Sequence, residues 1–443
     1  MRIEKEHINV TRNVDWTLIV IYFILVTIGL VNAYSTGLVE DGQSFVDFGF
    51  NSGRQLMWFG ISLGVGALIL LLETSFIRKH AYIFYGVIMF MLVCVLFFPA
   101  VNGQKSWFGW GSIGVQPSEF AKTATALALA KYLTTINIKI QDAMARNMAV
   151  LIIGIPCALI LLQPDPGTLL VFASFALVMY REGLSGNILL FGFLSIIIGV
   201  LTLILKSSAV DMFGQEIKGH YVMILVLWLI ALLVAFLIKN FIKRRDRKNA
   251  YVTLLMSFIV SVSFIFVVDL GYSKILKEHH RDRIELQLGL REDPDGKDYN
   301  RNRAMASVGS GDFFGKGYTK STLANARLDH VPEQSTDFAY CTWSEEFGFL
   351  GSSGIVVIFM IFLLKIVEMA ERQRSQFSRI YGYSVACIFF MHFMINIGMI
   401  IGLAPVVGIP LPFISYGGSS LLSFSILLFV LVKLDSDRKE VLR

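Results

Sequence analysis

The first apolar run of this chain reads WTLIVIYFILVTIGLVNA and occupies residues 16–33. It contains no acidic or basic side chain, and a helix needs about 20 apolar residues to cross a bilayer. Similar runs recur along the 443 residues, of which 55% are hydrophobic, and the mean hydropathy is +0.64. A soluble protein of this length cannot bury so much apolar surface. The sequence therefore predicts an all-α, polytopic integral membrane protein.

Twelve apolar runs of helix length are predicted to span the membrane as a helical bundle. We expect them to form a single membrane domain over residues 1–443. A cleaved signal peptide at the first run is disfavoured, because no small-residue cleavage site closes it and many more runs follow. The runs lie at residues 16–33, 54–73, 81–98, 118–135, 148–162, 167–180, 186–205, 221–239, 251–270, 339–368, 380–404 and 412–434.

The distribution of basic residues orients the chain in the membrane. The short segments on one side hold most Lys and Arg, including the basic run at 243–248. The short loops on the other side hold only Arg54, Lys105, Lys206 and Lys218. Since basic loops stay in the cytoplasm, both termini are predicted to be cytoplasmic. This asymmetry explains the net charge of +6 without a nucleic-acid partner.

One long polar segment, residues 271–339, interrupts the apolar runs, and the topology places it outside the membrane. It is rich in charged residues, Gly, His and Pro. Long loops in compact folds are usually functional or disordered. Glu333 and Asp337 lie near its end, and Asp337 sits at the edge of the next apolar run. Chemistry is therefore expected here, although Asp337 could also serve as the N-cap of the following helix.

The sequence QPSEFAK at residues 116–122 places charges at the start of an apolar run. Pro117 and Ser118 suit a helix start. Glu119 and Lys122 are three residues apart, so they share one helix face and can pair. Ionisable residues inside a membrane span are costly and are functional candidates by default. A structural ion pair and a polar cavity, with Lys122 available to an anionic group, both fit this pattern.

Further polar residues fit both a purely structural and a functional interpretation. The sequence QPDPGT at 163–168 suits broken helices that line a cavity, and equally a tight outside turn. The Gly, Pro and Ser residues at 405–420 favour close helix packing, and His392 favours a hydrogen-bonded structural role. Glu345 and Glu346 lie near the start of the apolar run 339–368. There they line the same cavity as Asp337 or lie at its solvent-filled entrance.

Other catalytic and metal-binding patterns are not visible in the sequence. The four cysteines lack metal spacing and suit apolar packing. We find no His/Glu pair with metal spacing and no phosphate loop. The glycines at 309–311 and 315–317 could form an anion-binding nest.

Taken in order, these motifs resemble the SEDS family of RodA and FtsW, and the resemblance covers most of the chain. The matching motifs are RQ at 54–55, KSW at 105–107, QPSEFAK at 116–122, QPDPGT at 163–168, DPDG at 293–296, GSG at 309–311, GKG at 315–317, PE at 332–333, TDF at 336–338, EEFG at 345–348 and PLPFISYGGSS at 410–420.

The resemblance implies a peptidoglycan glycosyltransferase that polymerises lipid II outside the bacterial cytoplasmic membrane. It also implies a class B penicillin-binding protein as partner, along with other membrane proteins of the elongation complex. In the family, the aspartate at the position of Asp337 is essential, and the residues matching Glu119 and Lys122 line the central cavity. A ten-span core is expected, so residues 206–270 are interpreted as an insertion of two spans. Ser335 and Arg303 stand where the family often has His and Gln.

The implied reaction makes three demands on the chain. An acceptor hydroxyl must lose a proton, the departing diphosphate must be stabilised, and the undecaprenyl tails must stay in the bilayer. Asp337 is the candidate general base. Basic residues could stabilise the diphosphate, the candidates being Arg54, Lys122 and Lys316. The remaining candidate cavity residues are Gln55, Trp107, Glu119, Glu333 and Glu345. The sequence points to no particular cofactor, and a divalent cation, Mg²⁺ or Mn²⁺, is left open because no ligand set is visible.

Three alternatives are kept beside a RodA-like role in elongation and cell shape. An FtsW-like role in division shares the same chemistry. A flippase or transporter for lipid-linked saccharides would use the broken helices and intramembrane charges. A non-catalytic scaffold would recruit the synthase and would not need Asp337.

Overall fold

The computed structural model describes residues 13–438, apart from 39–43, 100–104, 111–112, 136–139, 208, 213–214, 276–296, 325–333 and 405. The chain divides into two compact units. The first consists of Met1–Leu184 and Tyr299–Arg443, and the second of Ser185–Asp298.

The first unit is helical, with one short antiparallel hairpin among its described residues. Its elements are α1 (Trp16–Thr36), α2 (Asn51–Leu71), α3 (Thr74–Val95), β1 (Phe108–Trp110), β2 (Ile113–Val115), α4 (Pro117–Leu133), α5 (Ala143–Leu162), α6 (Pro166–Phe172), α7 (Ser174–Arg181), α12 (Lys297–Ser310), α13 (Ala339–Glu371), α14 (Gln376–Ile400) and α15 (Gly418–Ser436).

The helical membrane architecture predicted from the apolar runs is confirmed. Within the described residues, ten helices are long and apolar enough to cross a membrane. Two further predicted spans correspond to α4, which has 17 residues, and to the pair α6 and α7. The total of twelve spans stays a prediction.

The helix starts follow from local sequence chemistry. The Asp15 side chain accepts a hydrogen bond from the Leu18 N–H and so caps α1. Pro117 occupies the first turn of α4, where its missing N–H costs nothing. Asp165 caps α6 by accepting from the Thr168 N–H at 3.0 Å. The predicted start of the fourth span at 118 therefore falls within one residue of the observed start.

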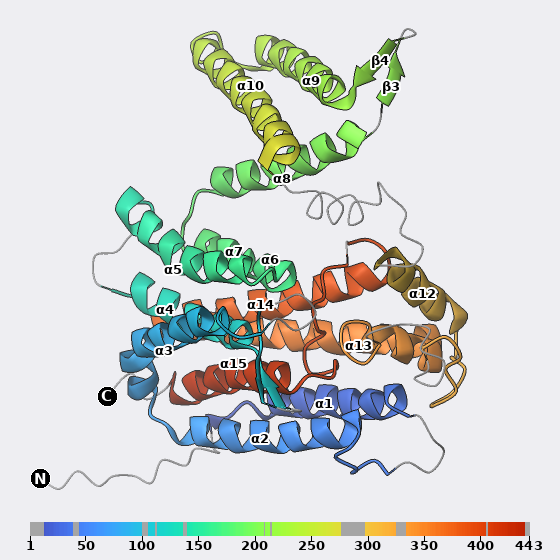
Figure 1. Ribbon diagram of the computed structural model, residues 1–443. Coiled ribbons are helices and arrows are strands. Elements are labelled where there is room, and N and C mark those ends of the chain that lie inside the picture. The colour runs from blue at the N-terminus through green and yellow to red at the C-terminus, as the bar shows by residue number, and fades with distance from the viewer. Residues whose placement is uncertain are drawn as a thin grey trace, which may run out of the picture. The chain divides into compact units, whose positions relative to one another are not determined.

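The core of the first unit surrounds α14 and α15, which are its most buried long helices. α15 packs along α2, and α14 packs along α13 and α4 (Figure 1). A cluster of buried rings with centroids 5.1 to 6.0 Å apart joins these helices, formed by Phe362, Phe389, Phe413 and Phe424. Phe413 lies between α14 and α15 in the chain, so this cluster holds the connecting segment inside the core.

α13 is broken near its start. Gly348 has φ +65° and ψ −161°, which lie outside the helical range and suit glycine alone. The break frees backbone groups of α13, and the segment 312–317 satisfies them. Lys316 N–H and Gly317 N–H donate to the carbonyls of Glu345 and Glu346, each at 3.0 Å. Irregular backbone in a membrane protein requires this kind of internal pairing.

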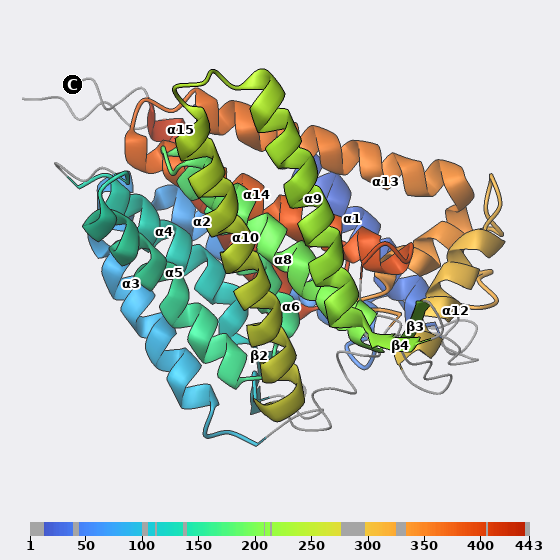
Figure 2. The same ribbon diagram turned by 90° about the horizontal axis from the view of Figure 1, so that it is seen from above.

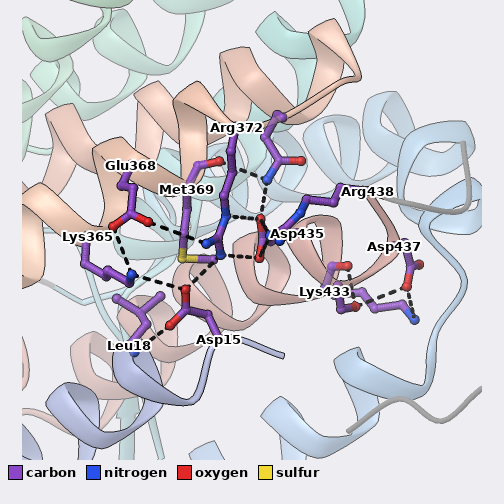
Figure 3. Close-up of polar contacts among 12 residues, drawn as sticks. Asp15, Leu18, Lys365, Glu368, Met369, Arg372, Lys433, Asp435, Asp437 and Arg438 are labelled. Carbon is purple, nitrogen blue, oxygen red and sulfur yellow. Dashed lines mark hydrogen bonds and ion pairs between the residues drawn. The ribbon is translucent and has the colours of Figure 1, made fainter. Parts of the chain in front are cut away.

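A cluster of buried charges joins three helix ends that the predicted topology places on one side of the membrane. Asp435 near the end of α15 is buried and accepts hydrogen bonds of 2.5 to 2.8 Å from Arg372, Gln373 and Arg438. Arg372 also donates to Asp15 at 2.8 Å. Figure 3 shows Asp435 between the two arginines. The start of α1 is thus tied to the ends of α13 and α15.

The charge of Asp15 is stabilised within this cluster. Burial raises the pKa of this carboxyl, but the hydrogen bonds from Arg372 and Leu18 and the charge of Lys365 together lower it more. The net result is a pKa below the usual aspartate range.

The second unit contains α8 (Gly186–Ser207), the hairpin β3 (Ala209–Met212) and β4 (Gln215–Lys218), α9 (Gly219–Phe241), α10 (Arg247–Leu270) and a π-helical turn (Gly271–Ile275). Its three long helices pack on one another, and most described side chains of α9 and α10 are exposed or only partly buried. Such apolar surface is stable only in lipid. The predicted spans 221–239 and 251–270 coincide with α9 and α10, whereas the insertion at 206–270 stays a prediction.

Candidate functional site

Glu119 and Lys122 form a buried ion pair on the first turns of α4. Lys122 Nζ lies 2.8 Å from Glu119 Oε2, and both side chains are under 5% exposed. The pairing predicted from their spacing is confirmed. Lys122 Nζ also lies 2.8 Å from His392 Nε2 and 4.8 Å from the centre of the Phe424 ring. Ser423 donates to the Glu119 carbonyl at 2.8 Å, so α15 helps to fix this turn.

Asp337 lies directly before α13, and its side chain is partly exposed. The N-cap of α13 is Phe338 and makes no side-chain capping bond. The alternative role of Asp337 as that N-cap is therefore wrong. Its backbone carbonyl accepts from Asn396 Nδ2 at 2.9 Å. Its carboxylate faces the segment after α14, since Oδ2 lies 3.1 Å from where a Cβ on Gly408 would be.

Glu345 anchors the loop to α13. It is fully buried, and its carboxylate accepts from Ser307 Oγ and from the N–H groups of residues 322–324 at 2.8 to 3.3 Å. Lys316 Nζ completes the shell at 2.6 Å from Oε1. Figures 1 and 2 both show α12, which carries Ser307, beside one end of α13. The loop chain is thus wrapped around one carboxylate.

Among the described residues, Lys316 contacts three others, which bear on its expected role with a diphosphate. Besides Glu345, its amine contacts Ser310 Oγ at 2.9 Å and Thr322 Oγ1 at 2.7 Å. These contacts indicate that Lys316 helps to hold the loop on Glu345. Neighbouring Glu346 is also buried and accepts from Ser35 Oγ and from Thr319 N–H at 3.0 Å.

Arg54 and Gln55 begin α2 and differ in exposure. Arg54 is partly buried, and its guanidinium donates to the carbonyls of Phe48 and Gly49. Gln55 is fully buried. Its amide donates to the Ser415 carbonyl at 3.4 Å and accepts from Gly417 N–H at 3.2 Å, so it binds the start of α15 to α2.

Two other predicted positions serve a polar turn next to α4. Asp165 Oδ2 accepts from Gln116, Thr168 and Ser118 at 2.7 to 3.5 Å. Trp107 packs on β2, since a Cβ on Gly114 would lie 2.9 Å from its ring. The QPDPGT motif thus folds as a capped helix start packed against the start of α4.

The sequence predicted structural roles for His392 and Asn396 on α14 but not which residues they contact. His392 was expected to be hydrogen-bonded, which is confirmed, but its partner Lys122 lies 270 positions away in the chain. Asn396 Nδ2 donates to both Asp337 and Ile409. The only signal in the sequence was a pair of polar residues four apart in an apolar run, which shows that they share a face but not what they contact.

The structure does not identify a metal site, and one predicted site residue lies outside the described residues. Within the part of the chain that the structure describes, no group of three or more His, Cys, Asp or Glu is placed to hold a metal ion. Glu333 falls in the segment 325–333, which is not described. All four cysteines are free.

The fold and these buried charges define a multi-pass membrane protein with a polar site among apolar helices. The chain belongs to the cell cycle protein family of FtsW, RodA and SpoVE, whose model matches residues 15–215 and 213–440. The peptidoglycan glycosyltransferase RodA of Treponema pallidum is 29% identical over 92% of this chain and 94% of its own. Stage V sporulation protein E of Bacillus subtilis is 29% identical over 92% and 93%.

Solved structures share the fold. A chain from a peptidoglycan synthase complex that coordinates polymerization and crosslinking matches with a TM-score of 0.67 and 24% identity, over 96% of this chain and 98% of its own. The rod shape determining protein RodA of Thermus thermophilus matches with a TM-score of 0.59 and 22% identity, over 97% and 98%.

Proposed function

We propose that this protein is a peptidoglycan glycosyltransferase that polymerises lipid II, with Asp337 as general base. The observation that carries the proposal is the placement of Asp337. Asp337 is a partly exposed residue at the junction of the loop and α13, and Asn396 binds its backbone carbonyl. The names of the relatives, among them a RodA peptidoglycan glycosyltransferase, supply the substrate class. They also favour a role in cell-wall elongation and cell shape.

The proposed step forms one bond and breaks one. The acceptor sugar hydroxyl attacks the anomeric carbon of the donor and forms the new glycosidic C–O bond. The bond from that carbon to the lipid diphosphate breaks, and the diphosphate leaves with the electron pair. Asp337 takes the hydroxyl proton, a role that typically contributes about 10²–10⁴-fold to the rate.

The leaving diphosphate needs positive charge, and the three candidate cations differ in how their charge is used. Lys316 is held by Glu345 and two hydroxyls. Lys122 is neutralised by Glu119. The Arg54 side chain is partly buried, and its guanidinium bonds only to neutral carbonyls among its described partners. We therefore favour Arg54 for electrostatic stabilisation. A divalent cation, Mg²⁺ or Mn²⁺, would supply further charge if activity requires one.

The proposed location follows from the distribution of basic residues. Both termini would lie in the cytoplasm, and the loop 271–339 at the outer face of the bacterial cytoplasmic membrane. A class B penicillin-binding protein is the proposed partner. The resemblance to a chain from a complex that couples polymerization to crosslinking supports this pairing. Co-purification with an elongation or a division transpeptidase would distinguish the RodA-like role from the FtsW-like role.

The proposal is tested with purified protein in liposomes that contain lipid II, with and without Mg²⁺ or Mn²⁺. Glycan chains are expected on gels. Lipid II that crosses the bilayer without forming polymer would instead support a flippase. Neither polymer nor movement, with the partner transpeptidase present, would support a scaffold.

Lys122→Met tests whether the buried amine takes part. The variant keeps the length of the side chain but leaves Glu119 as an unpaired buried charge, which lowers stability, so the rate is taken per folded protein. If the amine takes part, polymerisation is at least tenfold slower (about 1.4 kcal/mol or more). Wild-type turnover in this variant would assign Lys122 to structure alone.

A further inference from the structure

Two buried side chains on α14, His392 and Asn396, have no part in the proposed chemistry, yet Asn396 contacts the proposed base Asp337 and His392 contacts the buried amine of Lys122. They are four residues apart and so share one face of the helix. Buried polar groups in a membrane helix are costly unless they are bonded. Their bonding partners are therefore informative about why they are there.

The contacts of His392 define its protonation. Its Nδ1 lies 3.1 Å from the Pro410 carbonyl, which can only accept, so Nδ1 carries the hydrogen. In the neutral ring Nε2 is then an acceptor, and it faces Lys122 Nζ at 2.8 Å. A protonated ring would put a second cation beside Lys122, with Glu119 as the one carboxylate bonded to this pair among the described residues. The geometry thus assigns a neutral His392.

This arrangement fixes the direction of the Lys122 amine. An ammonium group has three N–H donors, and Glu119 and His392 accept two of them at 2.8 Å each. The ring of Phe424 packs against both Lys122 and His392. Its centre lies 4.8 Å from Lys122 Nζ and 4.8 Å from the centre of the His392 ring. Without His392 the amine would keep one fixed contact and gain freedom to rotate.

Asn396 fixes the position of the Asp337 backbone, as His392 fixes the Lys122 amine. Its two amide N–H groups donate to the Asp337 carbonyl at 2.9 Å and to the Ile409 carbonyl at 2.6 Å. Ile409 and Pro410 are consecutive residues, so Asn396 and His392 donate hydrogen bonds to adjacent carbonyls of one backbone segment. That segment also carries Gly408, which faces the Asp337 carboxylate.

We propose that His392 and Asn396 are a pair of positioning residues. Both bind the backbone segment 408–410, and from there His392 holds the Lys122 amine and Asn396 holds Asp337 in place. The inference rests on the proposed function for the role of Asp337 as general base, and it adds a role for Lys122 in the same site. As positioning residues, His392 and Asn396 act through Lys122 and Asp337 and not on the substrate. A displacement of about 1 Å in a catalytic group can cost on the order of 10²-fold in rate.

Three variants of His392 separate its two contacts. His392→Gln keeps an acceptor that can reach Lys122, His392→Asn keeps a donor near Pro410, and His392→Leu keeps neither. We expect kcat for lipid II polymerisation to fall about 10- to 100-fold in the Leu variant, with KM within about twofold, and to be partly restored in the Gln variant. Asn396→Leu should show the same split between kcat and KM.

Ser384→Ala is the matched control, because Ser384 is a buried polar residue of α14 that donates to Ile380 within its own helix. It should retain wild-type kcat. Each rate is taken per folded protein from thermal unfolding in detergent. A folded His392→Leu protein with wild-type kcat would overturn the proposal, as would losses in rate that follow the melting temperature alone.

A spectroscopic measurement tests the contact without lipid II, so it stands even if the chain is not a polymerase. The chain has seven histidines, and the ¹⁵N signals of His392 are those that vanish in His392→Gln. We expect a protonated Nδ1 and a bare Nε2 whose shift changes in Lys122→Met. A ring protonated at Nε2, or at both nitrogens near pH 7, would contradict the proposed geometry.

Discussion

Glu345→Gln is expected to release the loop that covers the start of α13. The wild-type carboxylate accepts on both oxygens, whereas the amide offers one acceptor oxygen and one NH₂ donor. If the amide oxygen takes the place of Oε1, the NH₂ group faces the donors on Oε2: the Ser307 hydroxyl can turn and accept from it, but Ala324 N–H loses its acceptor. Hydrogen bonds to a charged group contribute about 1.5–3 kcal/mol each. The lost Ala324 bond and the loss of the charge that faces Lys316 together cost about 3 kcal/mol.

This cost appears as local opening of the loop, because the lost bonds all belong to the segment 307–324. A loss of about 3 kcal/mol corresponds to roughly 10²-fold more opening. Hydrogen exchange with mass spectrometry should show this acceleration at the amides of 322–324. Glu368→Gln, on the exposed surface of the same helix, is the control and should leave exchange unchanged. Unchanged exchange in Glu345→Gln would refute the role of this carboxylate as the loop anchor.

The charge cluster of Figure 3 and its pH response give two further predictions. Asp435→Asn should lower the unfolding free energy in detergent by about 3 kcal/mol, since it leaves Arg372 and Arg438 without their buried partner. The exposed Asp246→Asn should change it by less than about 0.5 kcal/mol, and equal effects in the two variants would refute this ranking. Because the folded pKa of Asp15 is lowered, its contribution is present above about pH 4 and fades as the pH falls below its unfolded value. The difference in melting temperature between wild type and Asp15→Asn should therefore shrink below pH 4, and a constant difference down to pH 3 would contradict it.

Local patterns were sufficient to predict the helices and one of the charged contacts. A long apolar run must become a helix in lipid, which is why the run at 16–33 became α1. The Glu119–Lys122 pair followed from spacing along one helix, which fixes distance without any knowledge of the tertiary fold.

Contacts between distant segments could not be predicted in this way. Lys316 was considered for substrate because a basic residue between glycines suggests an anion site, but its amine binds Glu345, 29 residues later. The break at Gly348 depends on backbone bonds from the segment 312–317. Such contacts depend on how the loop folds back, and no periodicity in the sequence encodes that path.

The most direct test of the account is the rate of lipid II polymerisation by Asp337→Asn in liposomes, compared with Asp312→Asn. Asp312 is an exposed residue of the same loop with φ +49°, a conformation that asparagine also tolerates. We predict a loss of about 10²–10⁴-fold for Asp337→Asn and wild-type activity for Asp312→Asn, with both proteins folded. Full polymerisation by Asp337→Asn would contradict the central claim that this carboxylate is the general base.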